Sequence, residues 1–512
     1  MILGIELGST RIKAVLIDGN GSVVAQGAHE WENQLIDGLW TYAIDDVWAG
    51  LQDAYSALNG EYKKQFGAPI TTLEGIGISA MMHGYLAFDK DDSLLVPFRT
   101  WRNTNTAQAA EELTAALGFN MPQRWSASHY YQAVLNKEPH VKSVAFLTTL
   151  AGYVHYKLTG KKVLGIGDAS GMFPISGNSY DEKMLESYNA LLLKHGVNAK
   201  LQELLPEVLL AGDDAGTLTA EGARLLDTEG NLSAGILVCP PEGDAGTGMV
   251  ATNAVKERTG NVSAGTSGFV MVVMEKPLSR VYPEIDVVTT PAGKPVAMVH
   301  VNNFTSEINA WASLFAEVAT LCGCNVSKGE LFELLFKKSA ESDCETGGLT
   351  GYNFLSGEPI AGVETGRPLF LRQPEGRLNL ANFMQMQIYS ALGGLSLGME
   401  ILAEENVQVD DICGHGGFFK TEFIGANAMS AAVNAPVTVM KNAGEGGAWG
   451  IALLALYAAS KKDTLEGFLA GLFSTTEKTT VTASVDERRK FAAFMTSYKK
   501  GLQIERLATE VL

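Results

Sequence analysis

Cysteine is scarce in this chain, and basic residues are outnumbered by acidic ones. Among 512 residues there are five cysteines, an odd number with no Cys-x-x-Cys pair. This usage argues against a disulfide framework or a structural zinc site and suits a reducing compartment. The formal net charge of −18 argues against a general nucleic-acid binder, whose phosphate contacts need a basic face. Anionic nucleotides stay open, because a backbone nest with a metal ion can hold them.

Long apolar runs and several common motifs are missing too. The most apolar late stretch, 448–459, is too short and too rich in Gly and Ala for a membrane span. Charged side chains interrupt the first apolar stretch, so we expect no signal-peptide core and a cytoplasmic protein. Neither a Walker GxxxxGK[ST] nor a zincin HExxH motif occurs. A loose dinucleotide-like match at 246–251 does not come directly off a strand, which disfavours an oxidoreductase.

The chain opens on two short apolar runs joined by Gly8-Ser9-Thr10, a pattern typical of a β-hairpin. Gly8 lets backbone N–H groups approach an anion, and the two hydroxyls add donors, so the turn could cradle a phosphate. Glu6 precedes the turn, where a carboxylate could hold a metal ion against that phosphate. The alternative is an ordinary hairpin turn with a surface Glu, since Gly-Ser-Thr turns are common.

The same pattern returns about halfway along the chain. Residues 259–273 again read as strand, turn and strand, with Gly265-Thr266-Ser267 in the turn. A feature repeated at half the chain length suggests a duplicated domain, and 512 residues suit two domains. Two facing hairpins of this kind could hold a nucleotide's phosphates between two lobes.

Two polar stretches in the first half are candidates for binding a sugar. Met82 and His83 follow a buried strand expected over 73–79, and ligands usually bind at such strand ends in an α/β sheet. Trp101 and Arg102 offer a ring to stack on and donors for hydroxyl groups. For this second stretch, a surface loop with one anchoring Trp is the alternative.

Glycine-rich turns supply the remaining candidates. Asp244 lies in such a turn after the apolar stretch 236–239, where a strand end would present a catalytic carboxylate rigidly. A helix cap is the alternative role for this Asp. Later in the chain, Gly416, Gly417 and the turn that holds Glu445 would let a flat base or ribose lie against the backbone.

Taken in order, these motifs make the chain resemble the FGGY carbohydrate kinases of the actin-like ATPase superfamily, over essentially its whole length. The resemblance rests on the two Gly-Ser/Thr turns, Met82-His83-Gly84 as in xylulose-kinase-like members, the Trp101 loop, Leu158-Thr159-Gly160 with Asp168-Ala169-Ser170, Gly243-Asp244, and the late glycine turns. It implies an α/β fold of two ribonuclease-H-like domains flanking a catalytic cleft. Residues 1–248 would carry the sugar site and first phosphate motif, and 249–512 the second phosphate motif and adenosine site.

The resemblance also implies an activity and its residues. The expected enzyme is an ATP-dependent kinase that transfers the γ-phosphate to the terminal hydroxyl of a ketose, with a ketopentose such as xylulose or ribulose favoured. Asp244 is then the catalytic base, and Glu6 and Asp244 hold Mg²⁺. The residues implied for ATP are Gly8, Ser9, Thr10, Gly265, Thr266, Gly416, Gly417 and Glu445, and those for the sugar are Met82, His83, Trp101, Arg102 and Asp244. The expected partners are a small-molecule sugar and ATP, without nucleic acid or membrane, and homodimerisation is left open.

Three features depart from the family pattern. Glu6 stands where Asp is usual, and Ala245 follows the implied base where Asn or Gln is frequent. The sugar loop, 101–105, lacks the carboxylate and the arginine of the usual W-x-D-x-R. The departures at Ala245 and in the sugar loop leave the sugar open, so kinases for fuculose, rhamnulose, gluconate or glycerol are alternatives, as is an actin-like ATPase without kinase activity.

Overall fold

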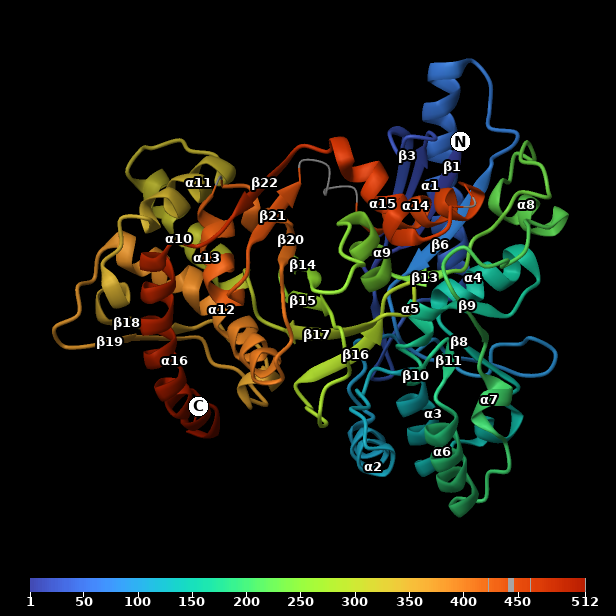
Figure 1. The fold of residues 1–512 in the computed structure, drawn as a ribbon, viewed down its shortest axis with the longest axis horizontal. Coiled ribbons are helices and arrows are strands. Elements are labelled where there is room, and N and C mark those ends of the chain that lie inside the picture. Colours follow the sequence, from blue (N-terminus) through green and yellow to red (C-terminus); the bar gives the residue numbers. More distant parts are fainter. Residues whose placement is uncertain (422, 441–445, 461, 512) are drawn as a thin grey trace. The chain divides into compact units, whose positions relative to one another are not determined.

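The computed structural model describes residues 1–421, 423–440, 446–460 and 462–511, which form two compact units. Unit 1 comprises Met1–Lys256, Arg280–Val296 and Glu445–Thr475, and unit 2 comprises Glu257–Ser279, Ala297–Gly444 and Thr476–Leu512. Each unit is built around its own sheet (Figure 1). The chain therefore leaves unit 1 and returns to it twice. The functional division at residue 248 stays a prediction.

The central sheet of unit 1 follows the order β13-β6-β1-β2-β3. Strands β1, β2 and β3 form an antiparallel meander that begins with the expected hairpin, while β6 runs parallel to β1 and β13 runs parallel to β6. The carboxyl ends of β1, β6 and β13 therefore meet at one edge of the sheet, where α/β proteins usually bind ligands. The strands are β1 (Ile2–Leu7), β2 (Arg11–Ile17), β3 (Val23–Glu30), β6 (Gly75–Ala80) and β13 (Glu242–Gly243).

Two helices cover this sheet, and their sequences explain how. Helix α1 (Ile44–Phe66) buries Val47, Leu51 and Leu58 at helical spacing against β2 and β3. Helix α14 (Gly446–Ser460) is buried through most of its length and packs on β1, β6 and α9 (Asp244–Ala251) (Figure 1). A Cβ on Gly4 of β1 would overlap the carbonyl oxygen of Ala448, so glycine is what lets α14 approach this close.

Unit 1 contains further strands and helices besides those of its central sheet. A short helix, α5, follows directly after β9, and a hairpin of β4 and β5 precedes α1. These elements are β4 (Gln34–Ile36), β5 (Leu39–Thr41), β7 (Leu86–Phe88), α2 (Ala107–Leu117), α3 (Ser126–Leu135), β8 (Phe146–Thr148), α4 (Leu150–Thr159), β9 (Val163–Gly165), α5 (Ile166–Ala169), β10 (Ile175–Ser176), β11 (Ser179–Tyr180), α6 (Glu182–Lys194), α7 (Leu201–Leu204), β12 (Glu207–Leu209), α8 (Ala220–Leu226), β16 (Ile285–Thr289) and α15 (Leu465–Leu472).

Unit 2 repeats the topology of unit 1. Its strands follow the order β17-β15-β14-β20-β21-β22, with β14 and β15 antiparallel and β20 parallel to β14, as β6 is to β1. The repeated hairpin of the sequence is thus β14 and β15, in the place that β1 and β2 take in unit 1. The strands are β14 (Thr259–Ala264), β15 (Gly268–Val273), β17 (Pro295–Val301), β20 (Asp411–His415), β21 (Val437–Met440) and β22 (Lys478–Val481).

The helices of unit 2 surround a nearly buried one. Helix α12 carries apolar residues on all sides and lies in contact with α11, α13 and α16. A small hairpin of β18 and β19 packs beside it. The elements are α10 (Ser306–Leu321), α11 (Lys328–Ser339), β18 (Leu349–Tyr352), β19 (Leu369–Arg372), α12 (Leu380–Glu404), α13 (Ile424–Val433) and α16 (Val485–Val511).

One local expectation is wrong. The strand expected over 236–239 consists only of isolated bridges, from Leu237 to Thr217 and from Val238 to Ile76, because two prolines follow at once and cannot donate to a ladder. Strand β8 and helix α4 follow one another with only Thr149 between them. The side chain of Thr149 accepts the N–H of Gly152 and so starts α4 there. Within the described part of the chain, no helix is long and apolar enough to cross a membrane.

Candidate active site

Asp244 lies at the edge of the unit 1 sheet where the parallel strands end. It is the first residue of α9, directly after β13. Its Oδ1 accepts the N–H of Met82 at 3.1 Å and that of Ala245 at 3.0 Å. A Cβ on Gly243 would overlap the side chain of Met82, so glycine is required for this approach. The structure therefore brings together Asp244 and Met82, which the sequence places 162 residues apart.

The carboxylate of Asp244 is exposed at the surface, yet protein surrounds it closely. Removal of water by this surrounding protein raises the pKa of Asp244. The N–H groups of Met82 and Ala245 act in the opposite direction but do not cancel the effect. Asp244 is accordingly a stronger base than an ordinary surface aspartate while remaining open to a ligand.

Glu6 of β1 is coupled to Asp244. Burial, followed by the charge of Asp244, raises the pKa of Glu6 to about 7, although the N–H of Ala448 and the charge of Lys13 lower it. Lys13 lies opposite Glu6 in the register of β1 and β2. A Cβ on Gly447 would overlap Oε1 of Glu6, so the start of α14 closes over this carboxylate. Lys13 is not among the residues predicted from the sequence, although pairing the two expected strands about the Gly8 turn places it opposite Glu6.

Glu6 and Asp244 fit a divalent cation. The charge of Asp244 raises the pKa of Glu6, so the two carboxylates are close enough to concentrate negative charge, and hard oxygen donors are what Mg²⁺ prefers. Among the described residues, no group of three or more His, Cys, Asp or Glu side chains could hold a metal ion. Mg²⁺ often takes only one or two protein carboxylates beside substrate phosphates and water, so the pair is sufficient.

A second pair of carboxylates lies buried behind this site. Glu242 accepts the N–H of Gly167 at 3.2 Å and that of Asp168 at 2.9 Å, at the start of α5. Asp168 accepts the hydroxyl of Thr149 at 2.6 Å on Oδ2, and its Oδ1 is buried without a partner. Burial raises the pKa of Asp168 to about 7, with a smaller contribution from Asp244, and burial followed by the charge of Asp168 raises that of Glu242 to about 8. No local pattern in the sequence marks Glu242.

His83 is fixed beside this cluster in an unusual backbone conformation. Its φ is 69°, in the left-handed region, and its Nδ1 lies 3.1 Å from the carbonyl oxygen of Gly171. The ring is nearly parallel to that of Trp125, with 6.2 Å between centroids. A Cβ on Gly171 would lie 2.6 Å from Nδ1, so the chain after α5 closes directly on the imidazole. Met82 and His83 therefore border the carboxylate cluster as one rigid segment.

The predicted sugar loop lies beside the first turn. The indole N–H of Trp101 donates to Oγ of Ser9 at 3.2 Å. The guanidinium of Arg102 lies 3.8 Å from the ring centroid of Trp40. Asn103 is buried and bonds both the N–H and the carbonyl of Trp40, which holds the loop to β5. The structure thus places Trp101 next to a predicted phosphate-binding residue.

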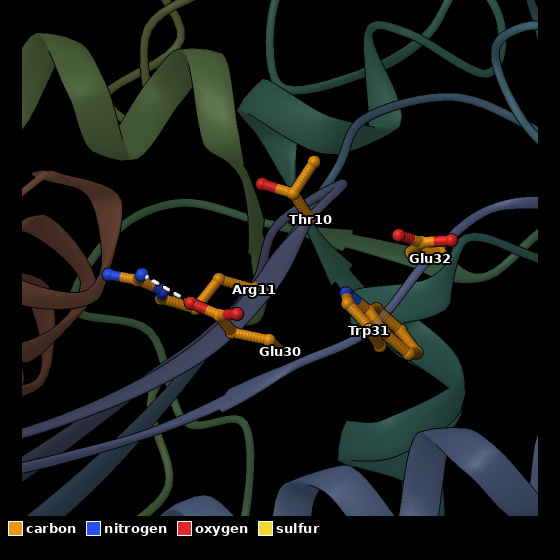
Figure 2. A pocket seen from close by; sticks show the side chains of 5 residues that line it. All are labelled: Thr10, Arg11, Glu30, Trp31 and Glu32. Atoms are coloured by element: carbon orange, nitrogen blue, oxygen red, sulfur yellow. Dashed lines mark hydrogen bonds and ion pairs between the residues drawn. The ribbon is translucent and has the colours of Figure 1, made fainter.

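The first turn borders a cavity of about 550 Å³ lined by Thr10, Arg11, Glu30, Trp31 and Glu32. Figure 2 shows Arg11 and Glu30 pointing toward one another from β2 and β3, with Thr10 at the end of the hairpin. Their ion pair measures 2.8 Å. The N–H of Gly8 donates to the carbonyl of Arg11 and closes the turn, which leaves the hydroxyls of half-buried Ser9 and exposed Thr10 as candidate donors.

The second turn borders a cavity of about 560 Å³ within unit 2. Gly265, Thr266 and Gly417 line it, so three of the residues predicted for ATP lie together. Gly416 does not line the cavity, but its φ of 111° and the carbonyl of Ala264 leave no room for a side chain. The cavity also contains residues that the sequence did not single out, namely Thr305, Asn309, Lys328, Phe332, Glu333, Phe418, Lys420 and Thr421. The predicted Glu445 lies outside the described residues.

Comparison with known protein families decides the relationship. Residues 1–244 match the N-terminal domain of the FGGY family of carbohydrate kinases, and residues 260–459 match its C-terminal domain. The chain belongs to the FGGY family of carbohydrate kinases. As a member of the FGGY family, it is an ATP-dependent carbohydrate kinase, and the predicted enzyme class is confirmed.

Individual FGGY relatives are distant. The chain is 23% identical to the xylulose kinase of Haemophilus influenzae, over 83% of this chain and 84% of that one. It is 24% identical to the gluconokinase of Bacillus subtilis, over 95% of this chain and 93% of that one. The crystal structure of ligand-bound xylulose kinase from Lactobacillus acidophilus superposes with a TM-score of 0.79 at 17% identity, covering 98% of each chain. These likenesses confirm the predicted two-domain α/β fold of the FGGY kinases.

Proposed function

We propose that this kinase phosphorylates the terminal hydroxyl of a ketose, and that the ketose is a ketopentose such as xylulose or ribulose. The observation that carries the proposal is the attachment of Asp244 to the Met82-His83 segment through the N–H of Met82. Both backbone donors bind Oδ1 of Asp244, so we assign Oδ2 to the substrate hydroxyl. The raised pKa of Asp244 suits a base that takes the proton as the hydroxyl attacks the γ-phosphate.

The charges around the Met82-His83 segment favour a neutral sugar. Two arginines bond the backbone that follows His83: the carbonyl of Arg124 accepts the N–H of Gly84, and that of Arg99 accepts the N–H of Tyr85. The guanidinium of Arg99 is paired with Glu138, and that of Arg124 with Asp286. Neither cation is left to pair with the carboxylate of a sugar acid, so hydroxyl groups are the better match. Relatives named xylulose kinase support the same choice.

The other residues of the unit 1 edge take supporting roles. Glu6 and Asp244 would hold Mg²⁺, which when bound offsets the charge on phosphate oxygens. Ser9 and Thr10 would donate their hydroxyl hydrogens to the transferred phosphate. Lys13, opposite Glu6, adds positive charge next to that phosphate. These groups position and stabilise charge, which is most of what phosphoryl transfer requires.

In unit 2, we assign the cavity at the second turn to ATP. Gly265 and Thr266 would contact phosphates and Gly417 the adenosine, since all three line that cavity. Its volume of about 560 Å³ lies within the range of small-molecule sites. On the sugar side, His83, Trp101 and Arg102 would contact hydroxyl groups, with the Trp101 ring as the apolar platform.

A coupled assay of ADP release tests the substrate. The panel contains D- and L-xylulose, D- and L-ribulose, fuculose, rhamnulose, gluconate and glycerol. We expect the highest kcat/KM with one ketopentose. Gluconate is the second candidate, because the gluconokinase of Bacillus subtilis aligns over 95% of this chain and Arg102 is exposed. A preference for gluconate or glycerol would overturn the ketopentose assignment.

Replacement of Asp244 tests the base. We expect Asp244→Ala to abolish sugar-dependent ADP release while leaving ATP affinity largely intact, measured by equilibrium dialysis. Near-normal turnover by this variant would refute the role given to Asp244.

A further inference from the structure

Three aromatic side chains donate hydrogen bonds to the first turn of unit 1. The indole N–H of Trp31 donates to the carbonyl of Gly8 at 2.7 Å, and the hydroxyl of Tyr42 donates to the carbonyl of Ser9 at 2.6 Å. The indole N–H of Trp101 donates to Oγ of Ser9 at 3.2 Å. Three separate segments of the chain thus fix consecutive acceptors of one turn.

Trp101 differs from the other two donors in both burial and target. Trp31 and Tyr42 are buried, and their rings are stacked with 4.2 Å between centroids. Both donate to backbone carbonyls. Trp101 is 37% exposed and binds a side-chain hydroxyl. Because Oγ of Ser9 accepts the indole N–H, its own hydrogen remains to donate elsewhere. Hydrogen bonds in series strengthen one another, so this acceptance makes Ser9 a better and better-directed donor.

The loop that carries Trp101 is held to the same turn by a second route. Asn103 bonds the carbonyl of Trp40 at 2.8 Å and its N–H at 2.9 Å, and Arg102 lies on the ring of Trp40. Trp40 is two residues before Tyr42, which reaches the Ser9 carbonyl. Loop, β5 and turn therefore form a closed ring of contacts, in which the side chain of Trp101 is exposed.

We propose that Trp101 is a positioning residue, whose indole N–H directs the Ser9 hydroxyl at the transferred phosphate while its exposed ring carries the sugar. A sugar lying on the ring holds the indole in place during turnover. Binding of the sugar therefore helps to orient the Ser9 hydroxyl, through the hydrogen bond from the Trp101 indole. This inference rests on the proposed function, in which Trp101 contacts the sugar and Ser9 the phosphate.

Trp101→Phe tests the proposal because it keeps a ring for the sugar and removes the N–H. We expect kcat to fall by about threefold to tenfold, the range that follows from the net worth of one hydrogen bond. We expect the KM for the sugar to stay within about twofold. Ser9→Ala should lower kcat at least as much, and adding Trp101→Phe to Ser9→Ala should cause no further loss.

Trp48→Phe is the matched control. Trp48 donates its indole N–H to the hydroxyl of Tyr153 at 3.2 Å, the same length as the bond from Trp101, and neither residue belongs to the site. We expect this variant to keep wild-type kcat and KM. Thermal melting of all four variants checks that each is folded.

Three outcomes would overturn the inference. In the first, Trp101→Phe lowers kcat no more than Trp48→Phe does. In the second, the double variant loses kcat by the product of the two single effects, and in the third, Trp101→Phe raises the KM for the sugar while kcat is unchanged. Each leaves Trp101 as a sugar contact or a structural residue. The variants are compared with whichever sugar the wild-type enzyme phosphorylates. If the ketopentose assignment is wrong, the substrate panel reveals it, and the test of Trp101 remains valid with the sugar that the panel identifies.

Discussion

Replacement of Asp168 by Asn should change how the stability of unit 1 depends on pH. The Asp168 carboxyl is 1% exposed, and burial raises its pKa from 3.8 to about 7. The folded chain therefore binds a proton there more tightly than the unfolded chain does. Such a group adds to the free energy of unfolding at low pH, and its contribution disappears as the pH rises through 7.

The magnitude follows from the two pKa values. Linkage gives Asp168 a contribution of about 2.7 kcal/mol at pH 5 and almost none at pH 8. Asn carries no charge at either pH, and its amide oxygen can still accept the hydroxyl of Thr149. Relative to wild type, the free energy of unfolding of Asp168→Asn should therefore rise by about 2.7 kcal/mol between pH 5 and pH 8.

Urea unfolding followed by tryptophan fluorescence measures this difference. Of the seven tryptophans, only Trp311 lies in unit 2, so the signal reports mainly on unit 1. Asp91→Asn is the control, because Asp91 is an exposed aspartate in a turn of the same unit. A difference from wild type that changes between pH 5 and pH 8 no more than that of Asp91→Asn would refute the assignment of a protonated Asp168.

Further substitutions probe Glu6 and the start of α14. Because the pKa of Glu6 is about 7, the Mg²⁺ concentration needed for half-maximal activity should rise as the pH falls from 8 to 6. Glu6→Asp should keep this trend and Glu6→Gln should lose both the trend and most of kcat; unchanged kcat and Mg²⁺ dependence in Glu6→Gln would contradict the metal role. Gly447→Ala should lower kcat at least about tenfold, since its Cβ would overlap Oε1 of Glu6 and lie 2.8 Å from Oγ1 of Thr247. Gly60→Ala, whose Cβ meets nothing within 4 Å in helix α1, should instead keep full activity, and equal kcat in the two Ala variants would contradict the packing argument.

The residues that the sequence identified are those whose neighbours in the chain define them. A Gly-Ser-Thr turn between apolar runs marks a hairpin by itself, and both hairpins form where expected. Met82 and Asp244 were found because each follows an apolar stretch, and strand ends gather at one edge of a sheet. Because these signals lie in short stretches of the chain, they can be recognised in a single sequence.

The residues that could not be identified from the sequence depend on partners far along the chain. Glu242 is a buried acceptor only because Gly167 and Asp168 turn their N–H groups toward it. Tyr42 and Trp31 bind the first turn from positions that look like ordinary aromatics of a core. A burial-raised pKa is likewise a property of the assembled fold, which no spacing in the sequence encodes.

The origin of α14 has a consequence for how the protein is made. Glycines at positions 4 and 77 leave space for a helix that the ribosome supplies only after residue 446, and unit 1 ends at Thr475. Between Lys256 and that point, synthesis at ordinary rates takes about 10 to 45 seconds. Throughout this interval the sheet that carries Glu6 is without its cover, and its apolar face is open to chaperones. The nascent chain therefore completes the edge that holds Asp244 only near the end of translation, after most of unit 2 has emerged.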